Sequence, residues 1–108
     1  MKEQLPGLTH LQFAVLEVLG TARNVSGKEL RKSLDGLGIK KSGPAFYQMM
    51  SRLEESKFVE GWYEQQIIDG QIIKERQYKI TGSGITSFNH TRAFYSRPSA
   101  SLVRPAFA

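Results

Sequence analysis

The residues best suited to recognition chemistry are Gln48 and Arg52, which lie four positions apart in an amphipathic stretch, residues 42–59. At helical spacing, one face of this stretch is polar and mostly uncharged, and it consists of Pro44, Gln48, Ser51, Arg52 and Glu55. A glutamine amide can make paired hydrogen bonds to adenine, and an arginine guanidinium can do so to guanine. The pattern therefore favours a helix that reads base edges in a DNA groove. The alternative is an ordinary exposed face, on which Arg52 interacts with Glu55.

The other face of the same helix predicts how it is held. Ser42 can cap the first turn, and Pro44 is tolerated only in a first turn. An apolar stripe recurs at helical spacing and ends in a lysine stem; it consists of Phe46, Met49, Met50, Leu53 and Lys57. A core on this side would hold the polar side rigidly enough to read a groove.

Positively charged side chains precede this helix. Lys40 and Lys41 lie directly before its N-terminus, where the helix dipole already favours phosphate. Lys28, Arg31 and Lys32 lie on the outward face of an earlier helix, where they either clamp phosphates or are simply solvated. Phosphate contacts of this kind would position the chain on DNA without reading its sequence.

Composition points to one small domain with a basic surface. The 108 residues carry a net charge of +5, are 40% hydrophobic and include no cysteine, which excludes disulfides and thiolate metal sites. Residues 28–57 carry seven bases and four acids, and residues 81–108 carry three arginines and no acid. Such an excess supplies salt-dependent affinity for nucleic acid. The sequence has no membrane-length apolar run and no signal-peptide pattern, so we expect a cytoplasmic protein without membrane partners.

Two helices are predicted before the polar-faced helix. Thr9 can cap a helix over residues 10–19 that is apolar nearly all round, which indicates burial on two sides, one of them by a second subunit. Ser26 and Glu29 form a capping box, so a second helix begins there and should close at residues 35–36. The three helices together have helix–turn–helix order.

A β-hairpin should follow directly. Residues 59–68 and 71–80 are β-prone and flank Asp69-Gly70, a strong hairpin signal. Lys74 and Arg76 point to the same side of the second strand.

Thr81 can then cap a fourth helix over residues 82–95. The order predicts an α+β winged helix–turn–helix, with three helices, a β-hairpin wing and a C-terminal helix, over residues 1–95. Residues 96–108 are interpreted as a flexible or partner-docked tail. In this architecture the third helix enters the major groove, and the wing lies along the backbone or minor groove.

Several of these residues match a known family, and the chain resembles the PadR family of bacterial winged-helix transcriptional regulators. Members typically read S-P-G-T-L-Y-P-x-L-x-R-L-E-x-x-G-L-V in the third helix, then W-x-x in the wing, then R-x-Y-x-L-T-x-x-G. The matching positions are Ser42, Gly43, Pro44, Phe46, Tyr47, Met50, Arg52, Leu53, Glu54, Phe58, Val59, Trp62, Tyr78, Ile80, Thr81 and Gly84. The opening L-T-H-L-Q-F-A-V-L-E-V-L is similar to the family's first helix, and the resemblance covers about residues 8–90.

The resemblance implies a homodimeric repressor on double-stranded DNA, with Tyr47, Arg52 and the residues near Ser42 in contact with it. Together with the patterns above, the candidate DNA-binding residues are Lys28, Lys32, Lys40, Lys41, Ser42, Gly43, Pro44, Tyr47, Gln48, Ser51, Arg52, Lys74 and Arg76. The long C-terminal dimerisation segment of larger members is missing, so a dimer would use the first and fourth helices. Its candidate contacts are Leu11, Val15, Leu19, Phe88 and Tyr95. Some members bind small molecules in their dimer regions, so an effector of unknown identity is a further possible partner.

The wing departs from the family pattern. Isoleucine pairs at residues 67–68 and 72–73 surround Asp69-Gly70, where members usually carry Gly, Arg and Pro, and residues 58–80 hold three bases against four acids. An exposed isoleucine cluster would be an interaction patch. The alternative function is therefore a winged-helix module for protein–protein interaction, and binding of DNA without sequence preference is a weaker third interpretation.

Enzymatic, metal and cofactor chemistry are not expected. His10 and His90 are far apart, with no Asp or Cys at ligand spacing. The G-S-G at Gly82 lacks the rest of a phosphate-loop signature. No pair of nucleophile and base can be named, so the sequence predicts a binding protein.

Overall fold

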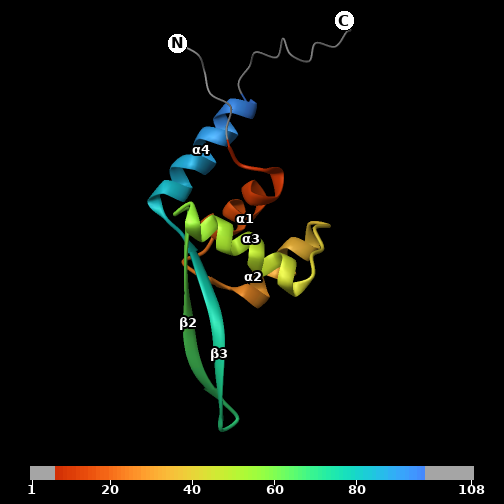
Figure 1. Ribbon diagram of the computed structural model, residues 1–108, viewed down its shortest axis with the longest axis vertical. Helices are drawn as coiled ribbons and strands as arrows, with labels where there is room; N and C mark the ends of the chain where they lie inside the picture. The colour runs from red at the N-terminus through yellow and green to blue at the C-terminus, as the bar shows by residue number, and fades with distance from the viewer. Residues whose placement is uncertain (1–6, 97–108) are drawn as a thin grey trace, which may run out of the picture.

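The computed structural model describes residues 7–96, and these residues form the predicted α+β winged helix–turn–helix (Figure 1). The elements are α1 (His10–Gly20), β1 (Val25–Ser26), α2 (Gly27–Gly36), α3 (Gly43–Glu55), β2 (Val59–Ile68), β3 (Gln71–Ile80) and α4 (Gly82–Ser96). The hairpin of β2 and β3, the wing, projects well beyond the helical body. Helix α4 includes Ser96, the first residue of the predicted tail; the rest of that tail lies outside the described residues. No helix among those described is long and apolar enough to cross a membrane.

The strand β1 is a difference from the sequence-based prediction, which contained only the hairpin. Its two residues pair antiparallel with β3, Val25 opposite Tyr78 and Ser26 opposite Gln77, so the sheet order is β1-β3-β2. Two residues are too few to produce an alternating pattern, which is why periodicity missed this strand. The pairing places the start of α2 directly against the sheet.

The predicted helix starts are confirmed. The Ser26 hydroxyl accepts a hydrogen bond from the Glu29 N–H at 3.0 Å, and the Glu29 carboxylate accepts one from the Ser26 N–H at 3.2 Å. Thr9 forms the same reciprocal box with Gln12, at 3.1 Å in both directions. Ser42 caps α3 in the predicted place. These caps fix where each helix begins relative to its neighbours.

One core lies between the helices and the root of the wing. Its buried apolar side chains are Val15, Leu16, Leu19, Val25, Leu30, Leu34, Phe46, Met49, Met50, Leu53, Val59 and Tyr78. All three helices of the helix–turn–helix contribute to this cluster. Helix α3 is therefore anchored along its whole apolar face.

The predicted apolar stripe of α3 extends too far at its C-terminal end. Lys57 lies outside the helix and has a left-handed backbone, with φ of 67°. Its N–H donates to the carbonyl of Glu54 at 2.9 Å, and the N–H of Phe58 donates to the carbonyl of Leu53 at 3.0 Å. This pair of bonds is a Schellman motif. Lys57 therefore turns the chain from α3 into β2 instead of extending the inner face of the helix.

The second helix ends at Gly36, as predicted, and the same motif follows it. Gly38 has φ of 84° and donates its N–H to the carbonyl of Asp35 at 2.9 Å. The N–H of Ile39 donates to the carbonyl of Leu34 at the same distance. Glycine is the residue that this position favours, because it has no Cβ to oppose a left-handed backbone.

The fourth helix starts close to the end of α3. Thr81 caps it as predicted, because its hydroxyl accepts a hydrogen bond from the Gly84 N–H at 2.9 Å. A Cβ at Gly84 would collide with the carbonyl oxygen of Phe58. Glycine at this position is therefore needed for the close approach of α4 to the turn that carries Phe58.

Candidate nucleic-acid interface

The polar face of α3 is exposed while its apolar face is buried, as the sequence predicts. The exposed residues are Pro44, Gln48, Ser51, Arg52 and Glu55. The ion pairs that form within residues 7–96 do not include Arg52, so its guanidinium is not held by Glu55. Gln48 and Arg52 also border a shallow hollow of about 350 Å³ shared with the start of α1. The structure thus leaves this pair available to solvent, and their contact with bases stays a prediction.

Tyr47 lies on the flank of α3 that faces α2. Its ring meets Phe46 edge-on at 4.8 Å between centroids, and its side chain is 40% exposed. A Cβ at Gly27 would come within 2.7 Å of the Tyr47 hydroxyl oxygen. The hydroxyl therefore sits at the N-terminal end of α2, beside the capping box of Ser26 and Glu29. Sequence reasoning missed Gly27, because no pattern linked it to Tyr47 before the fold was known.

The predicted phosphate-binding lysines gather around one hollow between α2 and the loop that leads to α3. Its volume is about 460 Å³, and its lining includes Lys28, Arg31, Lys32, Lys40 and Lys41. One acidic residue, Asp35, shares the lining and lies 3.8 Å from the Lys40 ammonium, with both side chains more than half exposed. An exposed pair of this kind is weak, so the hollow keeps a strong positive potential.

Arg31 has a structural partner as well as a place in this hollow. Its guanidinium donates to the backbone carbonyl of Lys41 at 3.2 Å and lies 5.9 Å from the centre of the Phe46 ring. It also lies 3.6 Å from the position that a Cβ on Gly43 would take. Arg31 therefore holds the loop before Ser42, whose own hydroxyl is occupied in capping α3.

In the wing, the two predicted cations have different surroundings. Arg76 forms an ion pair with Glu54 of α3 at 2.7 Å, and its guanidinium lies 4.7 Å from the centre of the Tyr63 ring. Lys74 is exposed, with its ammonium 5.6 Å from the same ring. Arg76 thus has an acidic partner, whereas Lys74 forms no ion pair with any residue between positions 7 and 96. The predicted DNA contacts of both remain untested by this geometry.

Two pKa shifts accompany the Arg76 cluster. Burial raises the pKa of Tyr78 above its ordinary value of 10.0, and the positive charge of Arg76 acts in the opposite direction. Burial also disfavours the charged form of Arg76, but its interactions with Tyr78 and Glu54 outweigh that effect and raise its pKa. The root of the wing therefore holds a permanent cation and a neutral phenol.

Two of the five predicted dimer contacts are wrong. Val15 and Leu19 are fully buried inside a single chain, so a second subunit cannot touch them. The sequence misled because α1 is apolar nearly all round, and the structure covers it with α2, β3 and α4 of the same chain. Leu11 is half-buried and Tyr95 is 68% exposed. Phe88 stacks on Phe13, with 4.5 Å between the ring centres.

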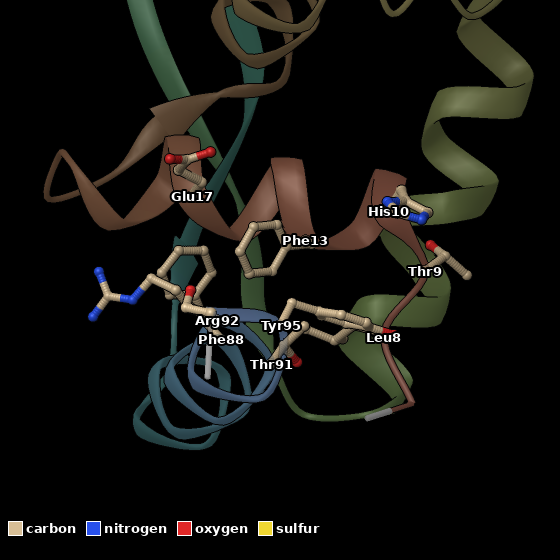
Figure 2. A pocket seen from close by; sticks show the side chains of 10 residues that line it. Leu8, Thr9, His10, Phe13, Glu17, Phe88, Thr91, Arg92 and Tyr95 are labelled. Atoms are coloured by element: carbon tan, nitrogen blue, oxygen red, sulfur yellow. The ribbon is translucent and has the colours of Figure 1, made fainter. Parts of the chain in front are cut away.

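A hollow between α1 and α4 was not predicted (Figure 2). Its volume is about 380 Å³; the stacked rings of Phe13 and Phe88 line its middle, and Tyr95 lies beside Leu8. Polar groups, including His10 and Arg92, border it. Within residues 7–96, no cluster of His, Asp or Glu side chains could hold a metal ion.

Comparisons with known proteins identify the architecture. No protein-family model matches the chain, and no curated protein matches it by sequence. A PadR-like transcriptional regulator from Bacillus cereus superposes with a TM-score of 0.68 at 22% identity, over 85% of this chain and 86% of that one.

Two similar structures were solved with operator DNA. Bacillus subtilis PadR superposes with a TM-score of 0.63 at 20% identity, over 92% of this chain and 56% of PadR. A variant of MarR from E. coli superposes with a TM-score of 0.62 at 21% identity, over 83% of this chain and 57% of MarR. The chain thus spans little more than half the length of either protein. The architecture of this chain is the winged-helix fold of PadR-like and MarR-type transcriptional regulators.

Proposed function

We propose that the chain is a sequence-specific DNA-binding transcriptional regulator of the PadR type. It acts as a repressor that binds an inverted repeat as a homodimer, with α3 of each subunit in the major groove. The observation that carries this proposal is the combination of an anchored α3 with an exposed polar face and a five-cation hollow next to it.

In this proposal each part of the surface has a different task. Gln48 and Arg52 read base edges, because they lie exposed on the polar face of α3 and can each make paired hydrogen bonds. Lys28, Lys32, Lys40 and Lys41 contact phosphates on one side of that helix. Tyr47, which is 40% exposed on the flank of α3, contacts DNA beside them. The PadR and MarR complexes with operator DNA support this use of the fold.

The apolar surface that α1 and α4 leave exposed supports dimerisation through these two helices. Tyr95 and Ile85 of α4 are 68% and 48% exposed, and Leu11 of α1 is only half-buried. A two-fold dimer would place two copies of α3 on half-sites about one helical turn apart, roughly 34–36 Å. An unidentified signal, a small molecule among the candidates, would release the repressor.

The deciding experiment is selection of bound sequences from a random duplex library with the wild-type chain. We expect enrichment of a motif with two-fold symmetry. The matched control is Gln48→Ala combined with Arg52→Ala, which keeps every lysine of the hollow and should bind DNA without enriching the motif. Binding by the wild type without any enrichment would refute sequence reading, and no binding by the folded chain would refute the proposal.

A second candidate function is a protein-interaction module, and one observation favours it. Ile67 and Ile72 at the wing tip are 76% and 70% exposed, although isoleucine is usually buried. If the folded chain does not bind DNA, this tip becomes the first surface to test for a protein partner.

A further inference from the structure

The isoleucines of the wing tip divide between its two faces. The register places Ile67 opposite Ile72, and because directly paired residues share a face, these two side chains lie together. Ile68 pairs with Gln71 and Ile73 pairs with Gln66, which puts both on the other face. Ile67 and Ile72 are also the most exposed of the four, so the apolar tip is concentrated on one side of the hairpin.

That side is the one turned towards α3. The outer part of the face, here called the inner wing face, consists of Tyr63, Gln65, Ile67, Ile72, Lys74 and Arg76. Arg76 binds Glu54 of α3, which fixes the orientation of this face relative to the recognition helix. Any ligand that lies against α3 and continues along the wing therefore meets this face.

Charge on the wing is segregated in the same way. The inner wing face carries Lys74 and Arg76 and no acid. The opposite face carries Glu60, Glu64 and Glu75 with one base, Lys79. The balance of three bases against four acids in residues 58–80 therefore combines two unlike faces with Asp69 in the turn. The face towards α3 carries Lys74 and the Arg76 that pairs with Glu54, whereas the face away from it carries three acids. A polyanion is therefore attracted to one side of the wing only.

The length of the wing suits a DNA groove. Ile67 and Ile72 lie four residue steps beyond the pair formed by Tyr63 and Arg76, or about 13 Å at the usual rise along a strand. Half of the roughly 34 Å helical repeat separates adjacent grooves along the DNA axis. Measured from Arg76, which contacts α3, the tip therefore covers about 13 Å of that roughly 17 Å, which brings it to the edge of the minor groove next to the major groove that α3 would occupy.

We propose that the wing tip enters this minor groove, where Ile67 and Ile72 wedge into a base step and bend the DNA, while Lys74 neutralises a flanking phosphate. Isoleucine is one of the apolar side chains that proteins insert between base steps, and such insertion partly unstacks the step and kinks the duplex. Flexible pyrimidine–purine steps deform most easily, so they should be preferred beneath the tip. This inference rests on the proposed function and adds to it a bent complex with sequence preference outside the α3 contacts.

The test measures the DNA bend by energy transfer between dyes at the two ends of a duplex that carries the selected site. Wild-type chain is compared with the double variant Ile67→Ser and Ile72→Ser, and with the matched control Ile68→Ser and Ile73→Ser on the opposite face. We expect the wild type and the control to bend the duplex. The variant with Ile67→Ser and Ile72→Ser should leave the duplex straight and bind at least about tenfold more weakly, because the lost burial of two isoleucines exceeds the unstacking energy that is no longer spent.

The outcomes separate this inference from the proposed function. If the wild type selects and binds its site but does not bend it, or if both double variants behave alike, the wedge is refuted and the regulator stands. If the folded wild type binds no DNA, both are refuted, and a protein partner for the isoleucines is the next test. Circular dichroism of each variant confirms that the exposed substitutions leave the fold intact.

Discussion

The guanidinium of Arg76 donates a hydrogen bond of 2.7 Å to Oε1 of Glu54, which joins β3 of the wing to α3. Both side chains are about three-quarters buried, with 23% and 26% of their surfaces exposed. Gly61 leaves the space for this contact, because a Cβ there would come within 2.9 Å of Arg76 and 3.0 Å of Glu54. This ion pair therefore adds a polar contact between the wing and α3 to the core packing of Val59 and Tyr78 at the root of the wing.

Removing either partner should destabilise the fold. We expect Arg76→Ala to lower the free energy of unfolding by about 2 kcal/mol, because Glu54 is left partly buried without its donor. The double variant with Arg76→Ala and Glu54→Ala should lose less free energy of unfolding than the two single variants lose together. The difference, which is the coupling energy of the pair, should be about 1–2 kcal/mol. Urea unfolding of the four proteins measures this coupling.

The matched control is the ion pair of Lys79 with Glu60, which joins β3 to β2 at 3.4 Å but is at least half exposed. Its coupling should be below about 0.5 kcal/mol, because water and side-chain entropy offset an exposed pair. Equal coupling energies for the two pairs would contradict the role assigned to burial.

Arg52 should contribute to sequence choice rather than to general affinity. We expect Arg52→Ala to cost about 1–3 kcal/mol on the selected site and to relax the preference at one base position. The reason is that a guanidinium can pair with two acceptors of guanine, and alanine with neither. Binding titrations against the selected site and single-base variants measure both effects. Unchanged affinity and preference would remove Arg52 from base reading.

Lys41 should act without regard to sequence. It lies in the basic hollow before α3, so Lys41→Ala should weaken binding to selected and random duplexes alike. The slope of log affinity against log salt should fall by roughly 1. Lys79→Ala, on the acidic face of the wing, is the matched control and should leave the slope unchanged. If Lys41→Ala weakened binding to the selected duplex but not to random duplexes, that result would argue against a phosphate contact.

The elements that sequence reasoning predicted well are those with local signals. Ser26 and Glu29 mark a capping box by type and spacing, and Asp69-Gly70 marks a turn in which both residues need a positive φ. The hairpin register and the exposed face of α3 follow from the same local patterns. For this reason the fold and the helix with Gln48 and Arg52 could be predicted before any contact was known.

What the sequence could not predict depends on contacts between distant residues. Val15 and Leu19 have the same pattern whether a second subunit or the chain's own α4 covers them. Gly27 lies close to Tyr47, and Gly61 lies close to the ion pair of Arg76 with Glu54. These contacts arise only when segments that are distant in the sequence pack together. The segregation of wing charge needed the register, because a sum over residues 58–80 averages two faces of opposite sign.

The raised pKa of Tyr78 predicts a loss of stability in alkaline solution. Its phenol is harder to ionise in the folded chain than in the unfolded chain, because burial disfavours tyrosinate. The stability that this group contributes is fully present below its ordinary value of 10.0 and is lost as pH rises towards its folded pKa. Melting temperatures across this range should fall less steeply for Tyr78→Phe. Tyr63→Phe, at an exposed ring, should follow the wild type.

The Schellman motifs that end α2 and α3 place two different residue types at the same backbone position. Gly38 and Lys57 occupy it with φ of 84° and 67°, so only the lysine carries the steric cost of a left-handed backbone. Lys57→Gly should raise the free energy of unfolding by about 0.5–1 kcal/mol, because relief of that cost exceeds the extra entropy of glycine in the unfolded chain. Gly38→Ala should lower it by a similar amount, as urea midpoints would report. A loss of stability in Lys57→Gly would mean that the lysine side chain contributes more at the end of α3 than its backbone costs.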